Sequence, residues 1–147
     1  MRFVAGLLWL ALTHAAYAEE PTYEQWSAQG ALLHRTLQCA AVAERAQKDE
    51  EVSRLLNAAL EIGRPLIEGV LSGRIKPRND LWIVPLGLLG AFSGPNTEFI
   101  LGRMWEHSRQ DASLSTRTLG LDEQREAAQN EFNRANCAVI AMPAMPK

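Results

Sequence analysis

Apolar side chains recur at helical spacing soon after the start of the chain. Within residues 23–47 they stand seven, four and four positions apart, at Trp26, Leu33, Leu37 and Ala41. This spacing places them on one face of a helix, because residues three or four apart are neighbours on a helix surface. No proline interrupts the segment. We predict a first helix from Tyr23 to Gln47.

A wider apolar stripe follows a short acidic run. Asp49 is suited to cap a helix there, because a carboxylate accepts hydrogen bonds from the free N–H groups of a first turn. Apolar residues then recur at helical spacing as far as Val70. Pro65 interrupts this second predicted helix, and a proline removes one backbone hydrogen bond, so we expect a kink or a break there. Gly73 marks its end.

Two further helices are predicted in the second half of the chain. Asn96 or Thr97 caps the first, which is expected to run to about Gln110. Residues 112–120 are expected to form a connecting loop, since they are rich in serine and threonine. Asp122 caps the last helix, expected to reach about Ile140, with a narrow apolar stripe at Ala128, Phe132, Ala135 and Val139.

The segment from Leu81 to Phe92 is the most apolar one after the leader. It is a poor strand, because Pro85, Gly87 and Gly90 interrupt any alternating pattern. We expect a short, buried helix that starts near Pro85. No pair of strands is predicted anywhere, so the fold class is all-α: a small bundle of four to five helices.

The N-terminal residues have the layout of a secretory signal peptide. Arg2 gives a positive start, Phe3 to Leu12 is an almost unbroken apolar run, and Ala16-Tyr17-Ala18 offers small residues for cleavage. A spanning helix needs about 20 apolar residues, so the run is too short for a stable membrane anchor. We expect cleavage after Ala18 and export to the bacterial periplasm or medium. Residues 19–147 then form one helical domain with a frayed tail from about residue 141.

The exported part of the chain has two cysteines, Cys39 and Cys137. Exported proteins meet an oxidising compartment, where an even number of cysteines suggests a bridge. With two cysteines only one intramolecular pairing exists. The sequence therefore predicts a disulfide that links the first helix to the last one, although two buried free thiols are the alternative.

Charge argues against some classes of partner. The whole chain has a net charge of −2, and removal of the leader takes away one arginine and no acidic residue. A nucleic-acid-binding surface needs a basic face, and attraction to anionic lipid needs one too. We therefore expect neither nucleic acid nor stable membrane insertion after cleavage.

Residues that could carry chemistry are few. His107 and Asp111 stand four positions apart and can share a helix face, but two such groups at a polar helix end do not make a catalytic or metal site. His34 has no acidic residue within a turn. Serine-nucleophile and phosphate-loop motifs are absent from the sequence. We expect no enzyme activity, no cofactor and no metal.

The block from Asn79 to Arg103 is the best local candidate for a binding surface. It places three aromatic residues, Trp82, Phe92 and Phe99, among prolines and glycines between two helices. Irregular aromatic segments on a rigid scaffold often bind other molecules, and they also often fill the core. We expect burial for Phe99, because Leu101, Met104 and Trp105 leave its helix few polar faces.

These observations favour a non-enzymatic periplasmic module that binds another protein, as immunity proteins and inhibitors do. The alternative is a carrier of a small apolar ligand in the bundle core, suggested by the apolar residues from Leu81 to Phe92. A hydrolase that uses His107 and a nearby acid is the least favoured reading.

Overall fold

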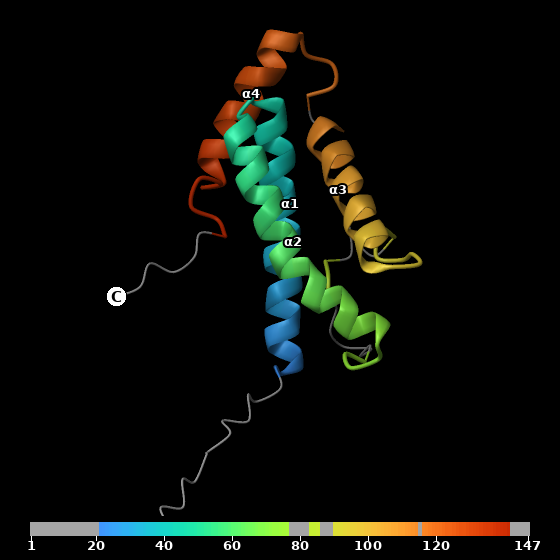
Figure 1. Cartoon of the computed structure of the whole chain (residues 1–147). Coiled ribbons are helices and arrows are strands. Elements are labelled where there is room, and N and C mark those ends of the chain that lie inside the picture. Colours follow the sequence, from blue (N-terminus) through green and yellow to red (C-terminus); the bar gives the residue numbers. More distant parts are fainter. Residues whose placement is uncertain (1–20, 77–82, 86–89, 115, 142–147) are drawn as a thin grey trace, which may run out of the picture.

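The computed structural model describes residues 21–76, 83–85, 90–114 and 116–141. Within these ranges the chain forms helices and no strands, which confirms the all-α class. The helices are α1 (Tyr23–Arg45), α2 (Asp49–Leu71), α3 (Thr97–Leu114) and α4 (Leu121–Arg134). α1 and α2 form an antiparallel hairpin, and α3 and α4 lie on different sides of it (Figure 1). The predicted leader and the tail from residue 142 lie outside the described residues.

α1 begins and ends with recognisable caps. The backbone N–H of Gln25 donates to Thr22 Oγ1 at 3.3 Å, and the N–H of Thr22 donates to the Gln25 side chain at 2.6 Å. This reciprocal pair satisfies N–H groups that have no partner within the helix. At the other end Gln47 adopts a left-handed conformation with φ of 58°, which turns the chain into α2. The predicted span is confirmed to within two residues.

The start of α2 differs from the prediction, and its proline behaves as expected. Lys48 occupies the N-cap position without a side-chain hydrogen bond, and Asp49 is already the first helical residue. Its carboxylate still lies at the positive end of the helix dipole, which favours an acid there. The helix continues through Pro65. Figure 1 shows its later part turning away from α1, in agreement with the predicted kink.

α3 is capped as predicted but is longer. The side-chain oxygen of Asn96 accepts a hydrogen bond from the N–H of Phe99 at 2.9 Å. The helix runs on to Leu114, into the segment that we expected to be a loop. Ala112 and Leu114 explain this extension, because both have high helix propensity and Ala112 is partly covered by the rest of the protein.

α4 is shorter than predicted, ending at Arg134 instead of Ile140. Asn136 has a φ of 54°, and the N–H groups of Asn136 and Cys137 donate to the carbonyls of Asn133 and Phe132, both at 3.1 Å. This is a Schellman motif, in which asparagine takes the left-handed position that usually holds glycine. Cys137 therefore follows the helix and does not lie within its last turns. Val139, which we placed on the apolar stripe, is exposed.

The core has two parts. The larger one lies between α1, α2 and α3 and is centred on large aliphatic side chains: Leu33, Leu37, Leu66, Ile67, Ile100, Leu101 and Met104. The smaller one packs Phe132 and Leu55 around Cys39 and Cys137. These cysteines form the predicted disulfide, with Cα atoms 5.4 Å apart. It links α1 to the segment that follows α4.

The apolar segment before α3 contributes to the larger core. Val84 and Ala91 are buried there, which agrees with a core role for this part of the chain. Residues 83–85 and 90–92 are not helical. The predicted helix near Pro85 falls mainly on residues 86–89, which lie outside the described residues.

Candidate functional site

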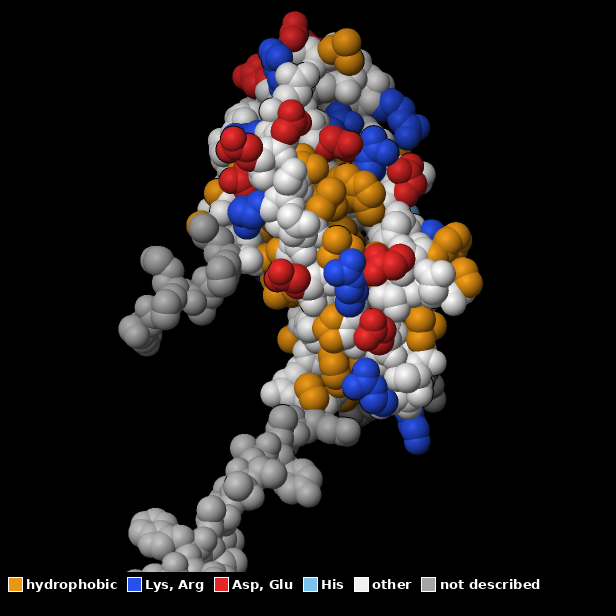
Figure 2. Space-filling model, viewed as in Figure 1, with side chains coloured by type: hydrophobic (Ala, Val, Ile, Leu, Met, Phe, Trp, Pro, Cys, Tyr) orange, Lys and Arg blue, Asp and Glu red, His pale blue; other side chains and the backbone are white. Residues whose placement is uncertain are grey.

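An apolar groove runs between α2 and α3. Its volume is about 260 Å³, and it is lined by Leu37, Leu56, Ala59, Leu60, Glu98, Leu101, Gly102 and Trp105. On the face seen in Figure 2, hydrophobic side chains gather between flanking charged ones. Leu56, Leu60 and Trp105 are only partly buried, so a molecule in the groove would remove further apolar surface from water.

The groove exists because α3 rests mainly on α1. The buried residues of α3 are Ile100, Leu101, Met104 and Ser108, which define one face of the helix. Toward α2, an exposed ion pair joins Arg64 to Glu98 at 2.8 Å, at the end of the groove where Glu98 lies. Between Leu60 and Trp105 the two helices leave the apolar hollow open.

Gly102 lies in the α3 wall of this groove. A Cβ atom added there would meet nothing within 4 Å. Gly30 and Gly63 differ, because a Cβ at Gly30 would lie 1.7 Å from the carbonyl oxygen of Ile83, and one at Gly63 would lie 2.5 Å from Leu101. Those two glycines are needed for packing within the protein. Gly102 has no such role, and a glycine inside a helix costs about 0.5–1 kcal/mol relative to alanine.

Phe99 is 49% exposed, so our expectation that it is buried was wrong. The buried face of α3 begins at Ile100, and one residue along a helix is a rotation of about 100°. That rotation carries the Phe99 side chain out of the core. The ring lies against the turn at Gly94, where an added Cβ would come within 2.2 Å of it. Phe99 also stands one turn before Gly102, on the outer side of the same helix.

The other two aromatic candidates are not brought to the same place. Phe92 is partly buried and packs against the larger core. Trp82 lies outside the described residues. The three aromatics of the sequence prediction therefore do not form one described surface, and Phe99 is the one with a large exposed area.

Two arginines near the groove are paired with carboxylates. Arg64 binds Glu98, and Arg109 contacts Glu44 at 2.7 Å and Glu106 at 3.2 Å. The hydrogen bond to Glu98 raises the pKa of Arg64. The Arg109 guanidinium also lies 5.9 Å from the centre of the Trp105 ring. The groove thus presents apolar walls, with the ion pair of Arg64 and Glu98 at one end.

A histidine pair on the other side of α3 was missed in the sequence. His107 and Asp111 form the predicted i,i+4 pair, with 3.6 Å between Nε2 and Oδ2. Packing of α1 on α3 brings His34 within electrostatic reach of both. Burial lowers the pKa of His34, and His107 lowers it further, whereas Asp111 opposes the shift. His34 Nδ1 is buried without a hydrogen-bond partner. No signal within one helix could have revealed this contact.

These groups do not make a metal centre. Across the described residues, no three histidine, cysteine, aspartate or glutamate side chains are placed to hold a metal ion. Ser108, the nearby buried hydroxyl, donates to the carbonyl of Met104 at 3.0 Å. This hydroxyl is therefore engaged by its own helix and is not aimed at either histidine.

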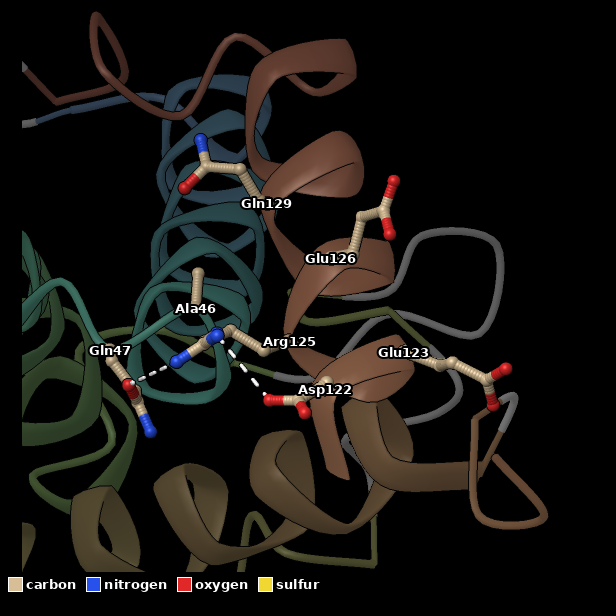
Figure 3. A pocket seen from close by; sticks show the side chains of 7 residues that line it. All are labelled: Ala46, Gln47, Asp122, Glu123, Arg125, Glu126 and Gln129. Carbon is tan, nitrogen blue, oxygen red and sulfur yellow. Dashed lines mark hydrogen bonds and ion pairs between the residues drawn. The ribbon is translucent and has the colours of Figure 1, made fainter. Parts of the chain in front are cut away.

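A polar hollow of about 580 Å³ lies between α4 and the turn that joins α1 to α2. Figure 3 shows Arg125 reaching across it to Gln47 and Asp122, at 3.3 and 3.4 Å, while Glu126 points outward. The Glu123 carboxylate accepts a hydrogen bond from the N–H of Gly120 at 3.0 Å. The hollow is wide and its central cation is used within the protein, so we do not regard it as the functional site.

Comparison with known proteins gives no identity. No protein family, curated protein or solved structure was found to match this chain. Among the described residues, no helix is both long enough and apolar enough to cross a membrane. The disulfide is compatible with an oxidising compartment.

Proposed function

We propose that this protein is an exported, non-enzymatic module that binds a segment of another protein in the groove between α2 and α3. The observation that carries the proposal is the groove itself: an open apolar hollow with Leu60 and Trp105 partly exposed at its edges. Interaction sites commonly combine an apolar centre with a polar rim. An exported location, with Glu19 as the mature N-terminus, is part of the proposal and rests on the leader sequence.

The chemistry of the lining supports binding over catalysis. Glu98 is the one charged side chain among the lining residues, and Arg64 already pairs with it. Catalysis by acid–base or nucleophilic groups needs several polar side chains converging on one point. The groove offers large apolar side chains instead, which recognise another apolar surface.

The size and shape of the groove favour a polypeptide over a small molecule. Sites for small ligands are concave, typically about 300–1,000 Å³, and bury most of the ligand. This groove is smaller, at about 260 Å³, and open to solvent. It suits a few side chains from one face of a helix, as in helix-in-groove recognition. The alternative from the sequence is a carrier of a small apolar ligand in the bundle core. In the described residues, this groove beside the core is the apolar hollow that such a ligand would occupy.

A selection from a display library of amphipathic helical peptides tests the proposal. The mature protein would be the target, and binding of enriched peptides would be measured by fluorescence anisotropy. We expect peptides that bind the native protein and lose affinity at least about tenfold with Leu60→Glu, a loss of about 1.4 kcal/mol. Leu71→Glu is the matched control, because Leu71 is exposed on the same helix and does not line the groove.

Two outcomes would contradict the proposal. One is a set of peptides that bind Leu60→Glu as well as the native protein, since they would use another surface. The other is failure to enrich any peptide, together with an apolar small molecule that remains bound in native mass spectrometry of the native protein and is lost in Leu60→Glu. That second result would establish the ligand-carrier alternative.

The location is tested separately. We expect intact-mass measurement of protein from a periplasmic extract to give a chain that begins at Glu19. Retention of residues 1–18 would contradict export by the route that we propose.

A further inference from the structure

A second cleft, separate from the groove, lies between α3 and α4 with α1 as its floor. Its volume is about 330 Å³, and Arg45, Asp111 and Glu131 are the charged side chains that line it. We propose that this cleft binds a free α-amino acid with an apolar side chain. The carboxylate of the ligand contacts Arg45, and its ammonium group contacts Asp111. This site is independent of the groove between α2 and α3.

The cleft follows from the way in which α3 and α4 pack. Both helices rest on α1, and they barely touch each other. Where they face one another across α1, the lining includes small side chains, Ala112 of α3 and Ala127 of α4, with Val42 of α1 below. Alanines leave space that larger side chains would fill. The resulting volume falls within the range of about 300–1,000 Å³ that is typical of sites for small ligands.

Arg45 brings a positive charge to this cleft. Its guanidinium is partly buried, and Nη2 donates to Thr116 Oγ1 and, at 3.1 Å, to Gln124 Oε1. Both partners are neutral. Within the described part of the chain, no carboxylate lies at ion-pair distance from Arg45, and its Nε and Nη1 groups have no acceptor. Two neutral contacts thus hold the cation in place while other N–H donors stay available for a carboxylate.

Asp111 brings a negative charge from the α3 wall. Its one ion-pair partner among the described residues is His107, with 3.6 Å between Nε2 and Oδ2, and that histidine is charged only when it is protonated. Glu131 on the α4 wall differs, because it accepts a hydrogen bond from Nε of Arg134 at 3.1 Å and forms an ion pair with that arginine. The cleft therefore holds one cation and one anion that lack a permanent counter-charge.

The class of ligand follows from these two charges. Arg45 and Asp111 line the same cleft but do not form an ion pair with each other. A ligand with a carboxylate alone would leave Asp111 as a like charge near it, and a ligand with an ammonium group alone would leave Arg45. A free α-amino acid carries both groups in charged form at neutral pH. An apolar side chain on it would contact Val42 and the alanines and remove apolar surface from water.

A titration of the native protein followed by amide NMR signals tests the proposal. The probes are L-leucine, N-acetyl-L-leucine, which lacks the ammonium group, and L-leucinamide, which lacks the carboxylate. We expect L-leucine at millimolar concentration to shift the signals of Val42 and Ala127 in a saturable way. Signals of Leu60 and Trp105 in the groove should not move. Each capped probe should bind about tenfold more weakly or worse.

Charge-neutral variants assign the two contacts. Arg45→Gln and Asp111→Asn should each weaken L-leucine binding about tenfold, because each removes one charge-assisted hydrogen bond. Arg45→Gln should leave the affinity for L-leucinamide unchanged, and Asp111→Asn should not weaken N-acetyl-L-leucine. A merely structural role would weaken all three probes alike. Arg125→Gln and Asp122→Asn are the matched controls, because these two residues pair with each other and do not line the cleft.

Three results would overturn the inference. One is the absence of saturable shifts at the cleft with L-leucine in the native protein. Another is a capped probe that binds as tightly as L-leucine, since only one of the two charges would then be read. The third is native affinity for L-leucine in Asp111→Asn, a variant of an exposed side chain whose folding a thermal melt would check. None of these results bears on the proposed function, which depends on Leu60.

Discussion

The helices on the two sides of the α1–α2 hairpin are held in different ways. α4 and the turn after it are joined to α1 by a disulfide and by the aromatic ring of Phe132. The side chain of Arg54 on α2 also donates to the carbonyls of Cys137 and Ile140, both at 2.9 Å. α3 is held by no disulfide, and the groove opens along part of its contact with α2.

The difference follows from how much apolar surface each helix can bury. Within α4, only Ala128 and Phe132 are buried. A helix with so small an apolar contribution gains little from the hydrophobic effect, which scales with the apolar area removed from water. α3 buries Ile100, Leu101 and Met104 and stays in place without a bridge. The disulfide thus joins α1 to the α4 side, where the helix buries the least apolar surface. The groove lies beside α3, which is held by packing and not by a disulfide.

Removal of the disulfide is the strongest way to test this comparison. Cys137→Ser should lower the free energy of unfolding by about 2–5 kcal/mol, because the bridge closes a long loop in the unfolded chain. The cysteines stand 98 positions apart. Chemical denaturation followed by circular dichroism would measure the loss. Hydrogen exchange should then be faster in α4 than in α3, and the opposite order would contradict our view that α4 depends on the bridge.

The Arg54 contacts are the second test of the α4 side. Arg54→Ala should cost about 1–3 kcal/mol, because two carbonyl groups of the C-terminal turn lose a charged donor. Arg125→Ala is the control, since Arg125 forms a 3.4 Å ion pair with Asp122 at an exposed position. Exposed pairs contribute about 0–1 kcal/mol. Equal destabilisation by the two variants, measured by urea unfolding, would show that the Arg54 contacts are no stronger than an exposed ion pair.

Glycine variants sharpen the comparison on the groove side. Gly102→Ala should stabilise the free protein by about 0.5–1 kcal/mol, because alanine favours the helix and its Cβ meets no atom. Gly30→Ala should have the opposite effect, since its Cβ would collide with the backbone of Ile83. Thermal unfolding of both variants gives the signs. A destabilised Gly102→Ala protein would mean that the glycine has a structural role within the fold.

The smallest expected effect is a pH dependence on the α3 side. The pKa of His34 is lowered in the folded protein from its ordinary value of 6.5. The unfolded chain therefore takes up a proton first as the pH falls, so this contribution to stability is complete above about pH 6.5 and declines below it. Two charged groups face His34: Asp111 raises its pKa, and His107 lowers it.

Melting temperatures at about pH 7.5 and about pH 5 measure this dependence on either side of the ordinary histidine pKa. His34→Gln should remove part of the difference between them. His107→Gln should reduce the difference by less, because it removes only a smaller cause of the lowered pKa of His34. An unchanged difference in His34→Gln would exclude His34 as the source.

Much of the helical fold could be predicted from sequence because the signals are local. The spacing of apolar residues gave the span of α1, and Asn96 gave the start of α3. The end of α4 could not be predicted in this way, because asparagine in a left-handed conformation replaces the glycine that usually signals a helix end. The disulfide was predictable from cysteine number and expected export, independently of helix boundaries.

The site was much less predictable. The groove depends on how far α3 stands from α2, which is a distance between helices and not a pattern within one. Phe99 was assigned to the core because its neighbours are apolar, although a single step along the helix turns it to the surface. Gly102 carried no signal in the sequence, since a lone glycine in a helix becomes informative only when the space around it is known.

The bridge between Cys39 and Cys137 also makes most of the chain a covalent ring. A single protease cut at any bond between the two cysteines opens the ring but leaves the two fragments joined, so the nicked protein separates only under reducing conditions. Force applied to the two ends likewise passes from residue 39 directly to residue 137. α2 and α3 lie inside the ring and their backbones carry none of this load, whereas residues 23–39 of α1, which include the groove residue Leu37, lie in its path.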